Sequence, residues 1–176
     1  AKGTSSRATK LAHGGVRYLA QGNFSLVREA LEERGRMLKN APNLVKPLAF
    51  VIPAYRWFDK LFYWVGLKMY DMLAGKLGVG PTTLMKLEQV LATIPTLKRS
   101  GLRGGVRYFD AQFDDARLAI ALMKSLHRLG GRAINYMPAI GFVKQDGRIT
   151  GVQAQCKFSG DTLELKAKAV VNACGV

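Results

Sequence analysis

The chain has 176 residues, 48% hydrophobic and 22% charged, a composition that argues against disorder and allows a buried core. Lysine and arginine number 27 against 12 acids, and the net charge of +15 favours anionic partners such as nucleotides, phosphorylated substrates, nucleic acid or an anionic membrane. The longest apolar run, residues 61–67, is far below the roughly 20 residues that cross a bilayer. Two cysteines, Cys156 and Cys174, predict neither a disulfide framework nor a metal site and fit a reducing compartment.

Residues 3–19 form a turn-rich run of hydroxyls, cations, a histidine and a glycine pair. Such groups, together with backbone N–H donors, suit a bound anion such as a phosphate. Gly14 and Gly15 allow backbone to approach a ligand closely, and Arg17 can hold a phosphate with two hydrogen bonds. His13 can move a proton, because histidine changes its charge near neutral pH. The alternative is a basic, partly disordered terminal tail.

The next segments predict two helices and a strand. The first helix covers residues 14–21, and the second begins at an N-cap, Asn23 or Ser25, and stops at residues 40–43. Residues 46–54 predict a strand, and its prolines, Pro47 and Pro53, favour a place at the edge of a sheet.

Residues 56–76 predict a helix rich in aromatic and basic side chains. Aromatic residues beside lysines suit the headgroup region of a membrane. A helix that packs its aromatics into the protein is favoured instead, because the adjacent residues Phe62, Tyr63 and Trp64 cannot all face one side. Residues 83–92 then predict a short helix and residues 97–105 a basic loop.

Residues 104–108 repeat the sequence of residues 14–18. The flanks differ, because the first copy leads into a predicted helix and the second into a predicted strand at residues 108–112. We therefore interpret the repeat as coincidence.

The last third of the chain predicts a helix followed by strands. Asp114 and Asp115 favour a helix start, so a helix is expected over residues 116–129. His127 near its end is interpreted as a surface or capping histidine rather than a catalytic one. The predicted strands are residues 133–136, 141–144, 149–154, 155–158, 162–166 and 167–172. Residues 145–148 predict a hairpin turn, and the last strand is apolar on both faces, as in a buried parallel strand. The fold class is therefore α/β, with a mixed sheet that contains an antiparallel meander.

The run at residues 3–19 resembles a motif of the FAD-dependent glycerol-3-phosphate dehydrogenases, T-S-S-x-x-[ST]-K-L-x-H-G-G-[LVI]-R-Y-L. The matching residues are Thr4, Ser5, Ser6, Thr9, Lys10, Leu11, His13, Gly14, Gly15, Val16, Arg17, Tyr18 and Leu19. Ala12 departs from the pattern, where a larger aliphatic residue is usual. The resemblance continues in order through residues 26–34, 38–45, 108–118 and 170–175.

The resemblance implies parts of two domains. Residues 1–46 and 113–176 would belong to a FAD-binding, Rossmann-like domain, and residues 47–112 to a substrate or cap region. A G-x-G-x-x-G fingerprint is absent and would lie just upstream in this family. We therefore expect an internal fragment that is inactive alone.

The resemblance also implies the chemistry, which is oxidation of sn-glycerol 3-phosphate to dihydroxyacetone phosphate with electrons passing through FAD to a quinone. Arg17 would hold the substrate phosphate, Tyr18 would face the substrate, and His13 would take the hydroxyl proton. The cofactor-binding residues would be Thr4, Ser5, Ser6, Thr9, Lys10, Leu11, Ala139, Ile140, Ala173 and Gly175. No metal is expected.

The resemblance implies a cytoplasmic protein, peripherally associated with the inner face of the cell membrane, and leaves a homo-oligomer open. One alternative is another flavin-dependent hydroxy-acid or amine oxidase, which would share the sheet but not the N-terminal motif. Another is a basic module that binds an anion or a membrane. Nucleic acid is not expected as a partner, because the basic residues are spread along the chain without a recognisable module. These residues do not separate a dehydrogenase from an oxidase.

Overall fold

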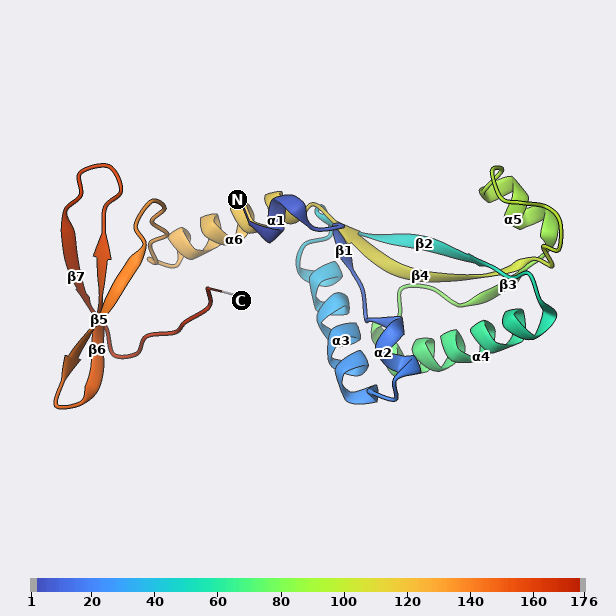
Figure 1. The fold of residues 1–176 in the computed structure, drawn as a ribbon, viewed down its shortest axis with the longest axis horizontal. Helices are drawn as coiled ribbons and strands as arrows, with labels where there is room; N and C mark the ends of the chain where they lie inside the picture. The colour runs from blue at the N-terminus through green and yellow to red at the C-terminus, as the bar shows by residue number, and fades with distance from the viewer. Residues whose placement is uncertain (1–2, 175–176) are drawn as a thin grey trace. The chain divides into compact units, whose positions relative to one another are not determined.

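The structure is a computed structural model that describes residues 3–174. The chain divides into two compact units, Ala1–Leu122 and Met123–Val176. Figure 1 labels the helices and strands of both units. The predicted division into FAD-binding and substrate segments stays a prediction.

The first unit is built on an antiparallel sheet whose central strand is β4. The strands are β1 (Leu11–Ala12), β2 (Val45–Pro53), β3 (Thr83–Met85) and β4 (Gly105–Phe113). β2 pairs with β4 along its full length, from Val45 opposite Phe113 to Pro53 opposite Gly105. β1 and β3 also pair with β4. Among the described strands β2 pairs with β4 alone, which confirms the edge position predicted from its prolines.

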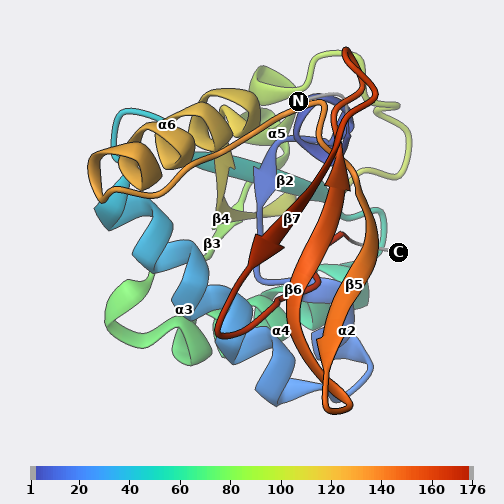
Figure 2. The same cartoon turned by 90° about the vertical axis from the view of Figure 1, so that its left-hand side faces the viewer.

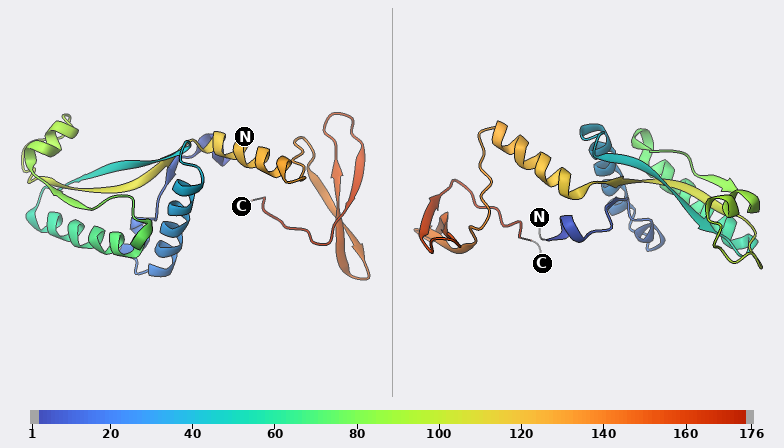
Figure 3. Two further views of the ribbon diagram at one scale, coloured as in Figure 1. Left: turned by 180° about the vertical axis from the view of Figure 1, so that it is seen from behind. Right: turned by 90° about the horizontal axis from the view of Figure 1, so that it is seen from above.

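Helices cover one side of this sheet (Figures 1 and 3). The helices of the first unit are α1 (Thr4–Arg7), α2 (Val16–Ala20), α3 (Phe24–Asn40), α4 (Trp57–Ala74), the 3-10 turn η1 (Gly75–Leu77) and α5 (Leu87–Thr93). The Asn23 side chain accepts a hydrogen bond from the backbone N–H of Leu26, 3.5 Å away, as expected of the N-cap of α3. Leu19, Val27, Leu31, Tyr70 and Ala74 form one buried core cluster, and Met85, Val90 and Leu102 form another.

The helix predicted over residues 83–92 is only partly present. Thr83–Met85 is the strand β3, which pairs with β4 opposite residues 105–107, and helix α5 begins at Leu87. The backbone groups of these three residues are bonded by a strand distant in the sequence, so a local pattern could not reveal them.

The second unit contains a three-stranded antiparallel meander, as predicted (Figure 2). Its strands are β5 (Ala139–Gln145), β6 (Arg148–Gln155) and β7 (Thr162–Lys166). Asp146 and Gly147 have φ angles of 50° and 75°, the left-handed values that a type I′ hairpin turn requires. Helix α6 (Asp115–Arg128) contains the boundary between the units, and its start is capped by Asp114, whose side chain accepts from the Arg117 N–H.

Two predicted strands are wrong within the described residues. Residues 133–136 and 167–172 are irregular, and Val171 is 85% exposed rather than buried. Residues 155–158 contribute only Gln155 to a strand. A strand needs a ladder of backbone hydrogen bonds to its neighbour. Each segment has such a bond at one end, from the Lys157 N–H to the Tyr136 carbonyl at 3.0 Å and from the Ala167 N–H to the Thr150 carbonyl at 2.9 Å, and among the described residues neither bond continues into a ladder. The α/β class and the meander are confirmed, while every described strand pairing is antiparallel.

Candidate functional site

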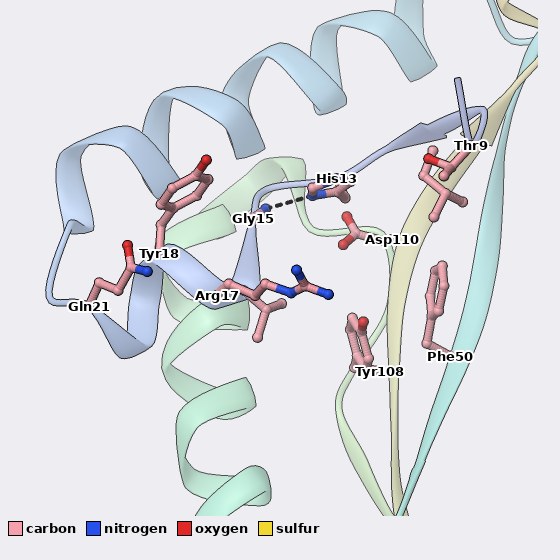
Figure 4. A pocket seen from close by; sticks show the side chains of 11 residues that line it. Thr9, His13, Gly15, Arg17, Tyr18, Gln21, Phe50, Tyr108 and Asp110 are labelled. Carbon is pink, nitrogen blue, oxygen red and sulfur yellow. Dashed lines mark hydrogen bonds between the residues drawn. The ribbon is translucent and has the colours of Figure 1, made fainter. Parts of the chain in front are cut away.

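A cavity of about 610 Å³ lies in the first unit, between α2 and the face of the sheet (Figure 4). Its volume falls within the roughly 300–1,000 Å³ of ligand pockets. The lining residues are Thr9, Leu11, His13, Gly15, Val16, Arg17, Tyr18, Gln21, Phe50, Tyr108 and Asp110. The three predicted catalytic residues, His13, Arg17 and Tyr18, therefore share one cavity.

Helix α2 carries Arg17 and Tyr18, and both side chains are exposed. Figure 4 shows Arg17 extending from α2 toward Tyr108, while the Tyr18 ring extends in another direction. The cavity thus combines an exposed cation with aromatic groups, an arrangement that suits a small anionic ligand.

The predicted cofactor residues fall into separate places. Thr9 and Leu11 line the cavity, whereas Lys10 lines a second cavity of about 390 Å³ together with Lys46 and Arg117. Thr4, Ser5 and Ser6 form helix α1 and are not among the residues that line the larger cavity. Ala139, Ile140 and Ala173 are exposed residues of the second unit, and Gly175 lies outside the described residues.

The sheet supplies cavity residues that the motif did not indicate. Phe50 of β2 lies directly opposite Tyr108 of β4, and their rings stack with centroids 5.3 Å apart. Tyr108 and Asp110 are two residues apart on β4 and so face the same side of the sheet. Burial, and then the neighbouring Asp110 carboxylate, raises the pKa of the Tyr108 hydroxyl. The sequence signal for these cavity residues is the pair of aromatics Phe50 and Tyr108. Recognising that they pair requires knowing the register of β2 and β4, which lie far apart in the sequence.

Behind the cavity lies a buried network made of Arg34, Tyr70 and Asp110. An Arg34 guanidinium N–H donates to Asp110 Oδ1 at 2.7 Å, and the Tyr70 hydroxyl donates to Asp110 Oδ2 at 2.9 Å. The Arg34 and Asp110 side chains are only 2% and 3% exposed. Burial, followed by the Asp110 charge, raises the pKa of Tyr70 well above its usual range. Sequence reasoning missed this network, whose three members come from α3, α4 and β4.

The network contacts the glycine turn, Gly14–Gly15, which is buried. The Gly14 N–H donates to the Tyr70 hydroxyl oxygen at 2.8 Å, and the Gly15 N–H donates to His13 Nδ1 at 3.1 Å (Figure 4). A Cβ on Gly14 would lie 2.6 Å from the Tyr70 hydroxyl oxygen and equally close to Leu31, so only glycine fits. The catalytic histidine proposed from the motif is therefore next to a fixed backbone turn.

Over residues 1–176 the chain matches the family described as FAD dependent oxidoreductase, and it belongs to that family. Among its relatives is the mitochondrial glycerol-3-phosphate dehydrogenase of Macaca fascicularis, 38% identical over 98% of this chain and 26% of the relative. The mitochondrial glycerol-3-phosphate dehydrogenase of Arabidopsis thaliana is also 38% identical, over 98% of this chain and 30% of its own length. The chain thus spans less than a third of either relative.

The fold is similar to that of a solved enzyme of the same kind. The glycerol-3-phosphate dehydrogenase of Bacillus halodurans, whose structure was determined in complex with FAD, superposes with a TM-score of 0.64 and 27% identity. The match covers 94% of this chain and 25% of that enzyme.

Two further observations concern the described part of the chain. Residues 3–174 hold no group of three or more His, Cys, Asp or Glu side chains placed to bind a metal ion. No helix among these residues combines the length and apolarity that crossing a membrane requires.

Proposed function

We propose that the chain is part of an enzyme that oxidises sn-glycerol 3-phosphate to dihydroxyacetone phosphate with FAD as its cofactor. The observation that carries the proposal is the convergence of His13, Arg17 and Tyr18 on one cavity. The relatives named as glycerol-3-phosphate dehydrogenases, which align with 98% of the chain, support the same substrate.

The residues around the cavity fit a flavin. The stacked rings of Phe50 and Tyr108 offer aromatic surface to the cavity, and Thr9 adds a hydroxyl. FAD, when bound, supplies the two-electron acceptor for oxidation of an alcohol. We propose Thr4, Ser5, Ser6, Thr9, Lys10, Leu11, Ala139, Ile140, Ala173 and Gly175 as its binding residues.

The chain's own side chains would bind and orient the substrate. Arg17 is an exposed, unburied cation whose planar guanidinium can grip a phosphate with two parallel hydrogen bonds. Tyr18, next to Arg17 on α2, is proposed to contact the substrate. His13 is proposed to form a hydrogen bond with the substrate hydroxyl. Arg17 therefore distinguishes a phosphorylated substrate from an unphosphorylated one.

A substrate panel tests this proposal in the full-length protein. With an artificial electron acceptor, we expect turnover with sn-glycerol 3-phosphate and little with glycerol, which lacks the phosphate that Arg17 binds. Turnover with glycine or L-proline instead would favour the alternative, a flavin-dependent amine oxidase. Adding ubiquinone as the acceptor in the same assay tests the proposed transfer of electrons to a quinone.

We also propose that the full-length protein attaches peripherally to a membrane, through helix α4. The expectation that this helix packs its aromatics inward holds for Tyr70, which is buried, but not for Trp57, Phe58 and Phe62, which are 72%, 61% and 62% exposed. Five exposed apolar side chains recur at alternating steps of four and three residues along α4, namely Phe58, Phe62, Val65, Met69 and Met72. Trp57, Leu61 and Tyr63 of the same helix are exposed as well.

Such a stripe on a basic protein suits the interface of an anionic membrane. Sedimentation with vesicles of phosphatidylglycerol and phosphatidylcholine tests the proposal. We expect the double variant Phe58→Ser/Phe62→Ser to bind more weakly than wild type, and equal binding would contradict it. A location at the inner face of the cell membrane remains a prediction.

A further inference from the structure

We propose that the buried network positions His13 as a hydrogen-bond donor to the ligand in the cavity. The network is Arg34, Asp110 and Tyr70, and it acts through the glycine turn, Gly14–Gly15. This inference rests on the proposed function, because it assigns the part that His13 plays in the same site.

The direction of each hydrogen bond in the network is determined by its chemistry. The Asp110 carboxylate accepts at both oxygens, from Arg34 at 2.7 Å and from the Tyr70 hydroxyl at 2.9 Å. A hydroxyl has a single hydrogen, so Tyr70, having donated it to Asp110, can only accept from a further partner. That partner is the Gly14 N–H, 2.8 Å away. The backbone at Gly14 is thus held by a chain of bonds that runs into the core.

The glycine turn transmits this constraint to His13. The Gly14 N–H belongs to the peptide between His13 and Gly14, and the Gly15 N–H belongs to the next peptide. With the first peptide held by Tyr70, the left-handed φ of +70° at Gly15 accompanies a bond from its N–H to His13 Nδ1, at 3.1 Å. Leu31 and Tyr70 pack closely enough against Gly14 to exclude any side chain there.

The bond to Nδ1 decides what neutral His13 can do. A neutral imidazole has one N–H donor and one acceptor nitrogen, and here the acceptor is Nδ1. The proton therefore resides on Nε2, and His13, which lines the cavity, donates a hydrogen bond rather than accepting a proton at that atom. A donor beside a cationic Arg17 suits an oxygen that carries or gains negative charge. His13 is then a binding and orienting group.

Nitrogen-15 NMR of the full-length protein, labelled at histidine, tests the tautomer without relying on turnover. The His13 signals, assigned as those lost in His13→Gln, should show an unprotonated Nδ1 and a protonated Nε2 at neutral pH. A protonated Nδ1 in the wild-type protein would overturn the inference. This outcome is independent of whether glycerol 3-phosphate is the substrate, so it separates the inference from the proposed function.

Two substitutions of His13 distinguish a donor from a base. Glutamine places an amide N–H near the position of Nε2, whereas asparagine is too short to reach it. We expect kcat/KM of His13→Gln to be about tenfold higher than kcat/KM of His13→Asn. A factor of ten corresponds to about 1.4 kcal/mol, the contribution of one hydrogen bond. Equal loss in both variants would show that His13 acts as a base and would overturn the inference.

Tyr70→Phe tests the positioning role of the network, with Tyr63→Phe on the same helix as its matched control. Without its hydroxyl, Tyr70 no longer accepts from Gly14, so we expect kcat to fall about tenfold with KM little changed. The His13 signals should also shift to a mixture of tautomers, while Tyr63→Phe leaves both readouts unchanged. A lower melting temperature with wild-type kcat and wild-type His13 signals would mean that the network only stabilises the fold.

Discussion

Charge pairs on this chain differ greatly in their contribution to the stability of the fold, because some are buried and others are exposed to solvent. Arg34 and Asp110 are paired at 2.7 Å with side chains 2% and 3% exposed, and Arg34 Nε is buried without a hydrogen-bond partner. Arg28 and Glu32 are paired at 3.2 Å on the surface of α3, with side chains 69% and 37% exposed. Water and salt weaken the second pair, whereas the first is shielded from water and held by a close charge-assisted hydrogen bond.

Asp110→Asn should therefore destabilise the full-length protein by about 3–5 kcal/mol, because Arg34 would keep a buried charge without its partner. The matched control, Glu32→Gln, breaks the exposed pair with Arg28 and should change the free energy of unfolding by less than about 1 kcal/mol. Urea unfolding measures both. Similar losses in the two variants would show that the buried pair does not stabilise the core.

Tyr108 gives stability a dependence on alkaline pH. Its pKa is raised by burial and by Asp110, so above about pH 10 the unfolded chain loses this proton while the folded chain keeps it. The contribution is present below pH 10 and is lost as the pH rises, by up to about 1.4 kcal/mol per pH unit. Tyr108→Phe should make the alkaline fall of the free energy of unfolding less steep, while Tyr70, whose pKa is also raised, keeps its own contribution. Phe50→Leu, which removes the stacked ring but no proton, should keep the wild-type slope.

At the scale of elements, the sequence correctly predicted those helices and turns whose start or stop signals lie within the segment itself. Helix α3 has its own N-cap at Asn23, and the β5–β6 hairpin has its own turn at Asp146 and Gly147. β3 was mistaken for helix, and residues 133–136 for a strand, because pairing with another segment decides both cases. Strand propensity alone cannot say whether a partner is present.

The glycine turn is the element that joins the core to the cavity, and Gly14→Ala tests it. The new Cβ would meet Leu31 and the Tyr70 hydroxyl at 2.5–2.6 Å, so we expect a loss of about 1–3 kcal/mol in the free energy of unfolding. Gly66→Ala is the control, since a Cβ there meets nothing within 4 Å and alanine favours helix α4 by about 1 kcal/mol. The melting temperature should therefore fall in Gly14→Ala and rise in Gly66→Ala. A neutral Gly14→Ala would show that the turn is not held by close packing.

At the scale of the whole molecule, the N-terminal motif contains seven of the eleven residues that line the cavity, and the fold supplies the other four. His13, Arg17 and Tyr18 are close together in sequence and could be read as one motif. Tyr70 lies 56 residues from its partner Gly14, and Asp110 lies 40 residues from Tyr70, so only the folded sheet and helices bring them together. The chain spans 26% and 30% of two of its relatives.

Anaerobic reduction of the flavin is the most direct test of the central claim, that this cavity belongs to an enzyme that oxidises glycerol 3-phosphate with FAD. The oxidised flavin absorption of the full-length protein should bleach when sn-glycerol 3-phosphate is added without oxygen. Arg17→Met should keep its flavin but need roughly ten to a hundred times more substrate, the worth of a charge-assisted hydrogen-bonding contact of about 1.5–3 kcal/mol. A flavin that stays oxidised with glycerol 3-phosphate, or a protein purified without flavin, would contradict the account.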